Sequence, residues 1–378
     1  MFNLKRKLCL LLALLFCFAF FASCTDDDND GDTSGSAESN GFISDDDDDD
    51  DDLSDIITDD QEESDIVSDY SIDVTDESPD VSIGEDLSEI NAFPMTFTKV
   101  SDALYRMECV APDGNTLFLT FDKKDWGTYN IGTWTVKDDK GKSVNLAGGG
   151  TDWEYVFRAG ETATTCDFSG GNHGKELLVD IDFYDGETNK KLNLKDNTPV
   201  KLNNIKIVEK TKLHWGDVNK TYCDVVRTYH VVGSQITLDV SFKYTKDCYK
   251  QLSYTCMFPV DKKYGLYCAF VDSDNNVIDV IETTKVGKAD YTGPFLGQLA
   301  ADRCVIWGYV NPNYKFDINV TTVTDSCDDF KNSYKTFYWD MNITSNKLYF
   351  SKYDSQTATL VKAGSEFNTH SAWTFYVD

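Results

Sequence analysis

The sequence predicts an all-β protein in which two antiparallel β-sandwich domains follow a disordered acidic segment. From residue 93 onward, short segments alternate apolar and polar residues and are rich in β-branched and aromatic side chains. Turn-forming Asp, Asn and Gly residues separate these segments, and helical periodicity never extends beyond about two turns. Residues 25–90 differ sharply, because they contain 28 Asp and Glu residues and no Lys or Arg.

Residues 1–23 have the pattern of a secretory signal peptide. Three basic residues at positions 5–7 precede fifteen consecutive apolar residues at positions 8–22. As a helix this apolar run spans about 22 Å, which is shorter than the ~30 Å hydrocarbon layer of a bilayer. The pattern therefore indicates export rather than a permanent membrane span.

The end of this segment resembles the lipobox of bacterial lipoproteins. In Phe21-Ala22-Ser23-Cys24, two small residues precede a cysteine, although Phe21 stands where Leu is usual. The acidic residues at positions 26–28 resemble the export signal of Bacteroidota surface lipoproteins. The resemblance implies an acylated Cys24 and a protein anchored by lipid at the cell surface, in the outer membrane. The alternative is cleavage nearby without a lipid, which would give a freely secreted protein.

Residues 24–92 form the predicted tether between this anchor and the folded part. The full chain has a net charge of −30, but the acidic segment alone carries −28, so residues 91–378 are close to neutral. High charge and few apolar residues predict disorder, and mutual repulsion predicts an extended spacer. Asp26 to Gly31 begins like a calcium-binding loop, but Ala37 occupies the twelfth position, where a bidentate Glu is needed. No metal site is predicted.

The folded part is too long for one ordinary sandwich, and we place the domain boundary near the Asn197-Thr198-Pro199 turn. The predicted domains are residues 93–206 and residues 207–378. Within the first, the alternation of residues 178–183 places Val179, Ile181 and Phe183 on one face of a strand.

Eight cysteines follow the signal peptide and the lipobox. Each predicted domain contains an even number of them, which in an exported protein predicts at least two disulfides formed within the domains. Several buried free thiols are the alternative. The eight are Cys109, Cys166, Cys223, Cys248, Cys256, Cys268, Cys304 and Cys327.

The sequence contains no familiar catalytic or cofactor motif. It has four histidines, no His-Glu-x-x-His, no Gly-x-Ser-x-Gly and no phosphate-binding glycine loop, so we predict no cofactor. Carboxylates are too numerous for any two to be chosen as an acid and base pair. Nucleic-acid binding is disfavoured, because the folded part has no basic stripe and the acidic segment repels phosphate.

Aromatic residues are the remaining candidates for ligand binding. Trp134, Trp339 and Trp373 share strand faces with other apolar residues and are predicted to lie in the core. One loop combines aromatic rings, which stack on sugars, with amides, which bond sugar hydroxyls. Its candidate ligand-binding residues are Trp307, Tyr309, Asn311, Asn313 and Tyr314.

We therefore predict a non-catalytic binding or adhesion module at the cell surface, whose ligand is a glycan or a surface protein. Two other classes stay open: a surface hydrolase directed at glycans, and a structural component of a surface layer or fimbria. A cleft with two close carboxylates would favour the hydrolase. A long unpaired edge strand would favour assembly.

The lipid anchor leads to a direct test at Cys24. Mass spectrometry of the mature N-terminus should find an acylated Cys24, and Cys24→Ala should release the protein from the membrane fraction. An unmodified N-terminus at another residue would contradict the prediction.

Overall fold

The computed structural model describes residues 94–377, apart from residues 112, 149–150, 273, 285–295, 300, 326–334 and 342. The signal peptide, Cys24 and the acidic segment lie outside the described residues, and so does Cys327. The described residues all belong to one compact unit.

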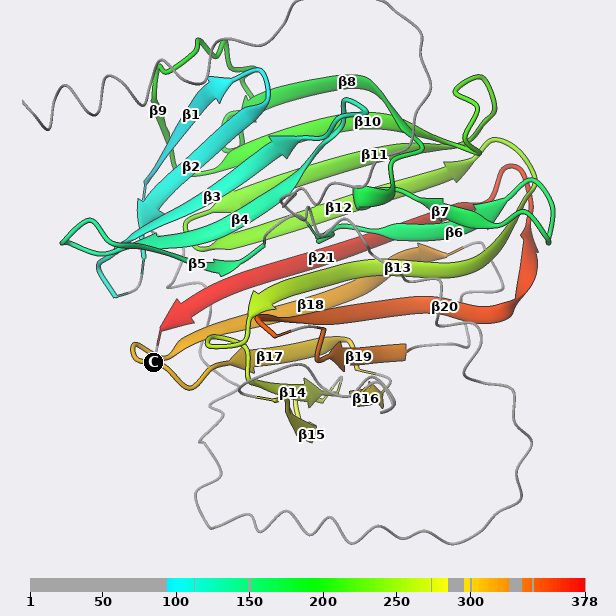
Figure 1. Cartoon of the computed structure of the whole chain (residues 1–378). Helices are drawn as coiled ribbons and strands as arrows, with labels where there is room; N and C mark the ends of the chain where they lie inside the picture. The colour runs from blue at the N-terminus through cyan, green and yellow to red at the C-terminus, as the bar shows by residue number, and fades with distance from the viewer. Residues whose placement is uncertain are drawn as a thin grey trace, which may run out of the picture. The chain divides into compact units, whose positions relative to one another are not determined.

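The prediction of an all-β protein with antiparallel sheets is confirmed (Figure 1). In the described ranges, the only helical element is the short 3₁₀ helix η3 (Gly171–His173). None of the described residues forms a helix long and apolar enough to cross a membrane.

The larger sheet has 12 strands in the order β16-β19-β20-β13-β5-β4-β3-β2-β1-β9, with β6 paired to β13 and β7 paired to β6. These strands are β1 (Met95–Ser101), β2 (Leu104–Val110), β3 (Thr116–Lys123), β4 (Tyr129–Lys137), β5 (Ser143–Ala147), β6 (Val156–Gly160), β7 (Asp167–Ser169), β9 (Val200–Leu202), β13 (Cys248–Asp261), β16 (Leu296–Leu299), β19 (Lys335–Trp339) and β20 (Ser345–Val361).

The smaller sheet has nine strands in the order β15-β14-β17-β18-β21-β12-β11-β10-β8. These strands are β8 (Glu176–Asp185), β10 (Ile205–His214), β11 (Thr221–Val232), β12 (Gln235–Tyr244), β14 (Tyr267–Val271), β15 (Val277–Glu282), β17 (Arg303–Trp307), β18 (Tyr314–Asp325) and β21 (Glu366–Val377). Figure 1 shows β8, β10, β11 and β12 side by side in this order, with β21 next to β12.

One hydrophobic core is shared by the two sheets. The Trp134 ring in β4 stacks on Phe316 in β18, with 6.0 Å between ring centroids. Phe121 in β3 meets Tyr229 in β11 edge to face at 5.0 Å. Trp134 and Trp373 are both buried in this core, as their strand alternation predicts.

The predicted boundary between residues 206 and 207 falls inside β10, which pairs with β8 on one side and with β11 on the other. Strands from both sides of residue 206 occur in both sheets. Alternation of residues identifies strands and their buried faces, but it does not identify which strands pair.

The alternation of β8 is interrupted by a bulge. Asp180 pairs with Lys210 and Leu178 pairs with Thr211, so Val179 has no partner in β10. A bulge inserts one residue and shifts the faces of the strand beyond it. Val179 is therefore 55% exposed, and its predicted place on the buried face with Phe183 is wrong.

The prediction of at least two disulfides is also wrong. All seven described cysteines are free thiols. Two disulfides need four cysteines, so the predicted pair of disulfides cannot form. All of them except Cys166 are buried, and they pack as small apolar side chains. Burial raises the pKa of Cys109 to about 12, which keeps this thiol protonated and unreactive at neutral pH.

The core also contains a buried group of charges. Arg227 in β11 is fully buried, and its Nη2 atom lies 2.7 Å from Glu209 Oε2 and 3.6 Å from Glu176 Oε1. The hydroxyls of Tyr155 and Thr211 both donate to Glu176 Oε1. Because isolated buried charges are costly, these contacts are needed to keep the charges inside the sandwich.

Two carboxylates of this core join one sheet to the other. Glu209 in β10 accepts a hydrogen bond of 2.9 Å from the Tyr129 N–H in β4. Glu154 accepts one of 2.7 Å from the Ile131 N–H in β4 and one of 3.1 Å from the Tyr229 hydroxyl in β11. The polar core therefore ties β4 of the larger sheet to β10 and β11 of the smaller one.

Glu209 makes folding stability depend on pH. Burial, against the opposing effect of Arg227, raises the pKa of Glu209 from 4.5 to about 8 in the folded protein. Between these values the unfolded chain loses a proton that the folded chain keeps, so stability falls as pH rises. Gln does not titrate, so the free energy of unfolding of Glu209→Gln should not fall in this way. Measured by urea unfolding, it should rise relative to that of the wild type by up to about 1.4 kcal/mol per pH unit over this window.

Glu366→Gln, at a partly exposed carboxylate in β21, controls for the loss of one surface charge. A constant difference between wild type and Glu209→Gln from pH 5 to pH 8 would contradict the raised pKa.

Candidate functional site

The five residues of the predicted ligand-binding loop are split between the surface and the interior. Tyr309 is 44% exposed and Asn311 is exposed, while Asn313 is half-buried. Trp307 and Tyr314 are each only 5% exposed. Trp307 lies in a cluster on the outer face of the smaller sheet, whereas Tyr314 belongs to the shared core.

Both buried rings of this loop have packing partners. Trp307 stacks on Tyr267, with 5.4 Å between centroids. Tyr314 packs on Phe375 at 5.2 Å, and its hydroxyl donates to Asp113 at 3.1 Å. The structure therefore brings Tyr309 and Asn311 to the surface, while the rings of Trp307 and Tyr314 are buried. A ligand at this loop stays a prediction.

A second group of aromatic rings lies on the outer face of the larger sheet. We call it the aromatic face, and it consists of Phe168, Tyr254, Phe337, Trp339 and Tyr349. It forms because β13, β19 and β20 carry apolar residues on both faces. In β20, for example, the neighbours of Tyr349 in the chain point into the shared core.

The rings of the aromatic face touch one another. Tyr349 stacks on Phe337 at 4.7 Å and lies 4.8 Å from Tyr254 and 6.1 Å from Trp339. Tyr254, Phe337 and Tyr349 are buried, whereas Phe168 and Trp339 are half-buried. Phe168 and Trp339 are therefore the rings that a ligand could reach. Trp339 shares its face with Phe337, as predicted, but it is half-buried against this outer cluster and does not belong to the core between the two sheets.

Charged and polar side chains border the aromatic face at Phe168. Arg158 in β6 pairs directly with Phe168 in β7, and its guanidinium carbon lies 5.5 Å from the centre of the Phe168 ring. His173 in η3 stacks on the same ring, with 4.7 Å between centroids. A cation and an imidazole thus both pack against the half-buried Phe168 ring.

A second polar group borders the face at Trp339. Lys347 in β20 pairs directly with Trp339 in β19, and its Nζ lies 4.8 Å from the centre of the Tyr349 ring. Lys347 Nζ is also 3.6 Å from Asp152 Oδ2. Asp152 in turn accepts a hydrogen bond from the Asn172 N–H in η3, which links this group to the one at Phe168.

We call these five side chains the polar rim: Asp152, Arg158, Asn172, His173 and Lys347.

Glycine permits the close approach of η3 to Asp152. Gly171 has φ of +52°, and a Cβ atom at this position would lie 1.9 Å from Asp152 Oδ1. Any other residue would therefore push η3 away from Asp152 and displace Asn172 and His173.

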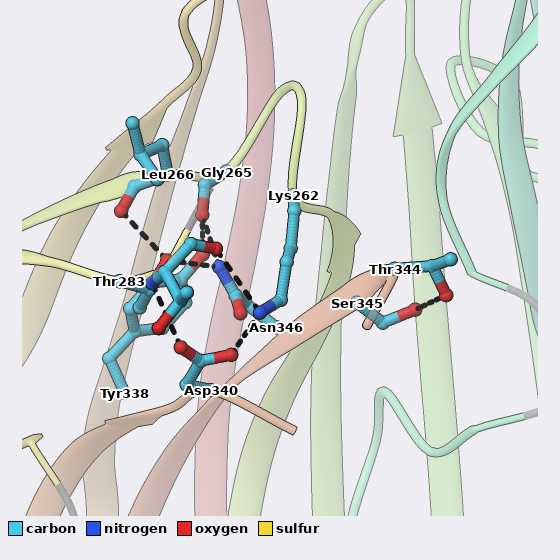
Figure 2. A network of polar contacts seen from close by, with 10 residues as sticks. Lys262, Gly265, Leu266, Thr283, Tyr338, Asp340, Thr344, Ser345 and Asn346 are labelled. Carbon is cyan, nitrogen blue, oxygen red and sulfur yellow. Dashed lines mark hydrogen bonds and ion pairs between the residues drawn. The ribbon is translucent and has the colours of Figure 1, made fainter. Parts of the chain in front are cut away.

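A buried ion pair between Lys262 and Asp340 lies next to the chain positions of the aromatic face, and Figure 2 shows its two side chains. Asp340, the residue after Trp339, pairs with Lys262, and both side chains are almost fully buried. Asp340 Oδ2 also accepts a 2.8 Å hydrogen bond from the Thr284 N–H, and Lys262 Nζ donates to the Thr284 carbonyl at 3.2 Å.

Hydrogen bonds extend this support on the same side of the sheet (Figure 2). Asn346, the residue before Lys347, donates to the Gly265 carbonyl at 2.7 Å and to Thr283 Oγ1 at 2.6 Å. Thr283 donates to the Leu266 carbonyl at 3.0 Å, and the Tyr338 hydroxyl donates to the Gly265 carbonyl. Since successive residues alternate in direction, fixing Tyr338 and Asn346 inward fixes their neighbours outward.

No cluster of three or more His, Cys, Asp or Glu side chains that could hold a metal ion occurs in the part of the chain that the structure describes. The aromatic and polar side chains of the site offer stacking, hydrogen bonding and ion pairing.

The aromatic face was not predicted from the sequence, because all aromatic residues in alternating strand segments were expected to lie in one core. One signal was present. The residues Phe337-Tyr338-Trp339 and Leu348-Tyr349-Phe350 are aromatic or apolar at consecutive positions, which predicts a strand with apolar contacts on both faces. The partners Arg158 and His173 gave no such signal, since they meet Phe168 only through strand pairing and η3.

No protein-family model matches this chain, and no curated protein matches its sequence. Among solved structures, the chain is similar to the GH36 α-galactosidase AgaA from Geobacillus stearothermophilus, with 10% identity, a TM-score of 0.38, and coverage of 72% of this chain and 41% of that one. For AgaB from the same organism the TM-score is 0.37, with 10% identity and coverage of 72% and 40%.

The chain is also similar to the Slr1438 protein from Synechocystis, with a TM-score of 0.30, 9% identity and coverage of 75% of this chain and 96% of that one. The chain thus spans about 40% of the length of the two galactosidases. With TM-scores below 0.5, these likenesses assign neither a fold family nor a function.

The buried pair behind Trp339 gives a stability prediction. Lys262→Met removes the cation that pairs with buried Asp340, which should lower the free energy of unfolding by about 3–5 kcal/mol. Lys243→Met is the matched control, because its pair with Glu366 is exposed and should be worth less than about 1 kcal/mol. Equal losses for the two variants in urea unfolding would contradict the supporting role of the pair.

Proposed function

We propose that this protein is a non-catalytic glycan-binding protein that is anchored by lipid at the cell surface. The observation that carries the binding role is the aromatic face, where the half-buried ring of Phe168 lies beside Arg158 and His173 and the half-buried ring of Trp339 lies beside Lys347. Sugar rings present apolar C–H faces to aromatic side chains and hydroxyls to polar ones. Ligand sites commonly combine aromatic walls with a few placed polar groups in this way.

The anchoring role is supported by the sequence. The lipobox-like residues before Cys24 and the acidic residues after it favour a lipid anchor. The acidic segment of residues 24–92 would act as a spacer that carries the folded part away from the membrane. A binding protein in this position would meet polysaccharides of its own cell and of its surroundings.

Binding is favoured over glycoside hydrolysis by the carboxylates of the rim. Hydrolysis of glycosidic bonds commonly needs two carboxyl groups on either side of the bond. Among the described rim residues, Asp152 is the sole carboxylate, and it is engaged by Lys347 and by the Asn172 N–H. The described rim thus lacks a second carboxyl group, and because Asp152 and Lys347 are buried, the polar groups open to a sugar lie near Phe168.

A glycan array probed with the full-length protein tests this proposal. Phe168→Ala and Trp339→Ala should each weaken binding about tenfold, which corresponds to about 1.4 kcal/mol for a lost stacking contact. Phe118→Ala is the matched control. Phe118 is also half-buried on the outer face of the larger sheet, with Arg106 at 5.4 Å from its ring, but it lies in β3.

Thermal unfolding of each variant separates lost binding from lost folding. Absence of binding to any glycan, or an equal loss in Phe118→Ala, would contradict the proposal. Turnover of a polysaccharide by the wild-type protein would replace it with the hydrolase.

A further inference from the structure

Arg158 differs from the other arginines of the described chain. Arg106 lies 3.6 Å from Glu108, Arg227 pairs with two glutamates, and Arg303 is bound through two nitrogens to Asp317. Arg158 alone among the described arginines has no carboxylate within 4 Å. Its Nε atom is buried and has no hydrogen-bond partner.

The neighbouring strand does not supply a carboxylate to Arg158. Asp167 in β7 is the nearest candidate, but it pairs in register with Ala159 and forms an ion pair with Lys175. On the other side Arg158 faces Leu252 in β13, which is apolar. The contact that holds the guanidinium is therefore the Phe168 ring.

The charge of the polar rim is consequently unbalanced. Lys347 and Asp152 offset each other, whereas Arg158 acts on the Asp167 carboxylate only from beyond ion-pair distance and has no carboxylate bonded to it beside Phe168. A guanidinium binds planar or tetrahedral anionic oxygen groups through two parallel N–H donors. An anionic group on the ligand would accept hydrogen bonds from the terminal guanidinium nitrogens, which, unlike Nε, are not buried, and it would balance the charge.

We propose that the glycan bound at the aromatic face carries an anionic substituent, a carboxylate or a sulfate, and that Arg158 binds this substituent. This inference rests on the proposed function, since it assigns the ligand class of the same site. It adds a specificity-determining residue that a neutral glycan would leave without a partner.

A series of ligands with one backbone tests the inference and separates the two anions. Chondroitin sulfate carries both groups, desulfated chondroitin carries the carboxylate alone, and carboxyl-reduced desulfated chondroitin is neutral. Calorimetry with the full-length protein should show at least tenfold tighter binding of one or both anionic forms than of the neutral form. Added salt should weaken binding of the anionic form selectively.

Variants of Arg158 assign the effect to this residue. Arg158→Gln should abolish the preference for the anionic form, while Arg158→Lys should retain part of it, because an ammonium keeps the charge but loses the two parallel donors. Arg106→Gln is the matched control, because Arg106 also lies over a phenylalanine ring of this sheet but is paired with Glu108.

The outcomes distinguish the two proposals. If neutral glycans on the array or in this series bind as tightly as anionic ones and Phe168→Ala weakens both, the anionic ligand is excluded while the glycan-binding role stands. If Arg106→Gln loses the preference as fully as Arg158→Gln does, the effect belongs to general surface charge and the assignment of Arg158 is overturned. If no glycan binds, both proposals fall.

Discussion

Arg227 lies fully buried between the two sheets, with the carboxylates of Glu209 and Glu176 at 2.7 Å and 3.6 Å from its Nη2 atom. A lone arginine could not remain in this position, because the cost of removing its charge from water is several kcal/mol. The same Glu209 accepts the Tyr129 N–H from the opposite sheet. Keeping the Arg227 guanidinium in contact with these carboxyl groups therefore also sets where β4 lies on β10 and β11, and the apolar core packs around this arrangement.

The aromatic face depends on a second buried pair in a different part of the larger sheet. Lys262 and Asp340 hold the end of β19 on the inner side, and strand geometry then turns Trp339 outward. Lys347 is turned outward in the same way, because the preceding residue, Asn346, is held on the inner side. The site is thus built on rigid strands rather than on loops, which suits the recognition of a stiff ligand such as a sugar ring, since little side-chain freedom is lost on binding. Arg158 and His173 complete the site from β6 and η3, which are linked to it through Phe168.

Local features of this protein could be predicted from its residues. The alternation of β-branched and aromatic residues predicted antiparallel strands, and it predicted the burial of Trp134 and Trp373 correctly. It failed at Val179, where one extra residue in β8 shifts the faces of the strand. It did not separate Trp339 from the core between the sheets, because a strand with apolar residues on both faces has no single buried side. Cysteine counts predicted disulfides that the described cysteines do not form, since parity and export do not show which side chains meet.

The sequence by itself determined the strand content, the alternation that faces most strands toward a core, and the separation of an acidic segment from a nearly neutral folded part. Only the tertiary structure decided which strands are neighbours, that residues on both sides of residue 206 share two sheets and one core, and that Arg158 faces Phe168 without a carboxylate partner. The physical reason is that period and composition are local properties of the chain. Strand pairing joins residues that are far apart in sequence, and such pairing depends on the packing and charge balance of the whole sandwich.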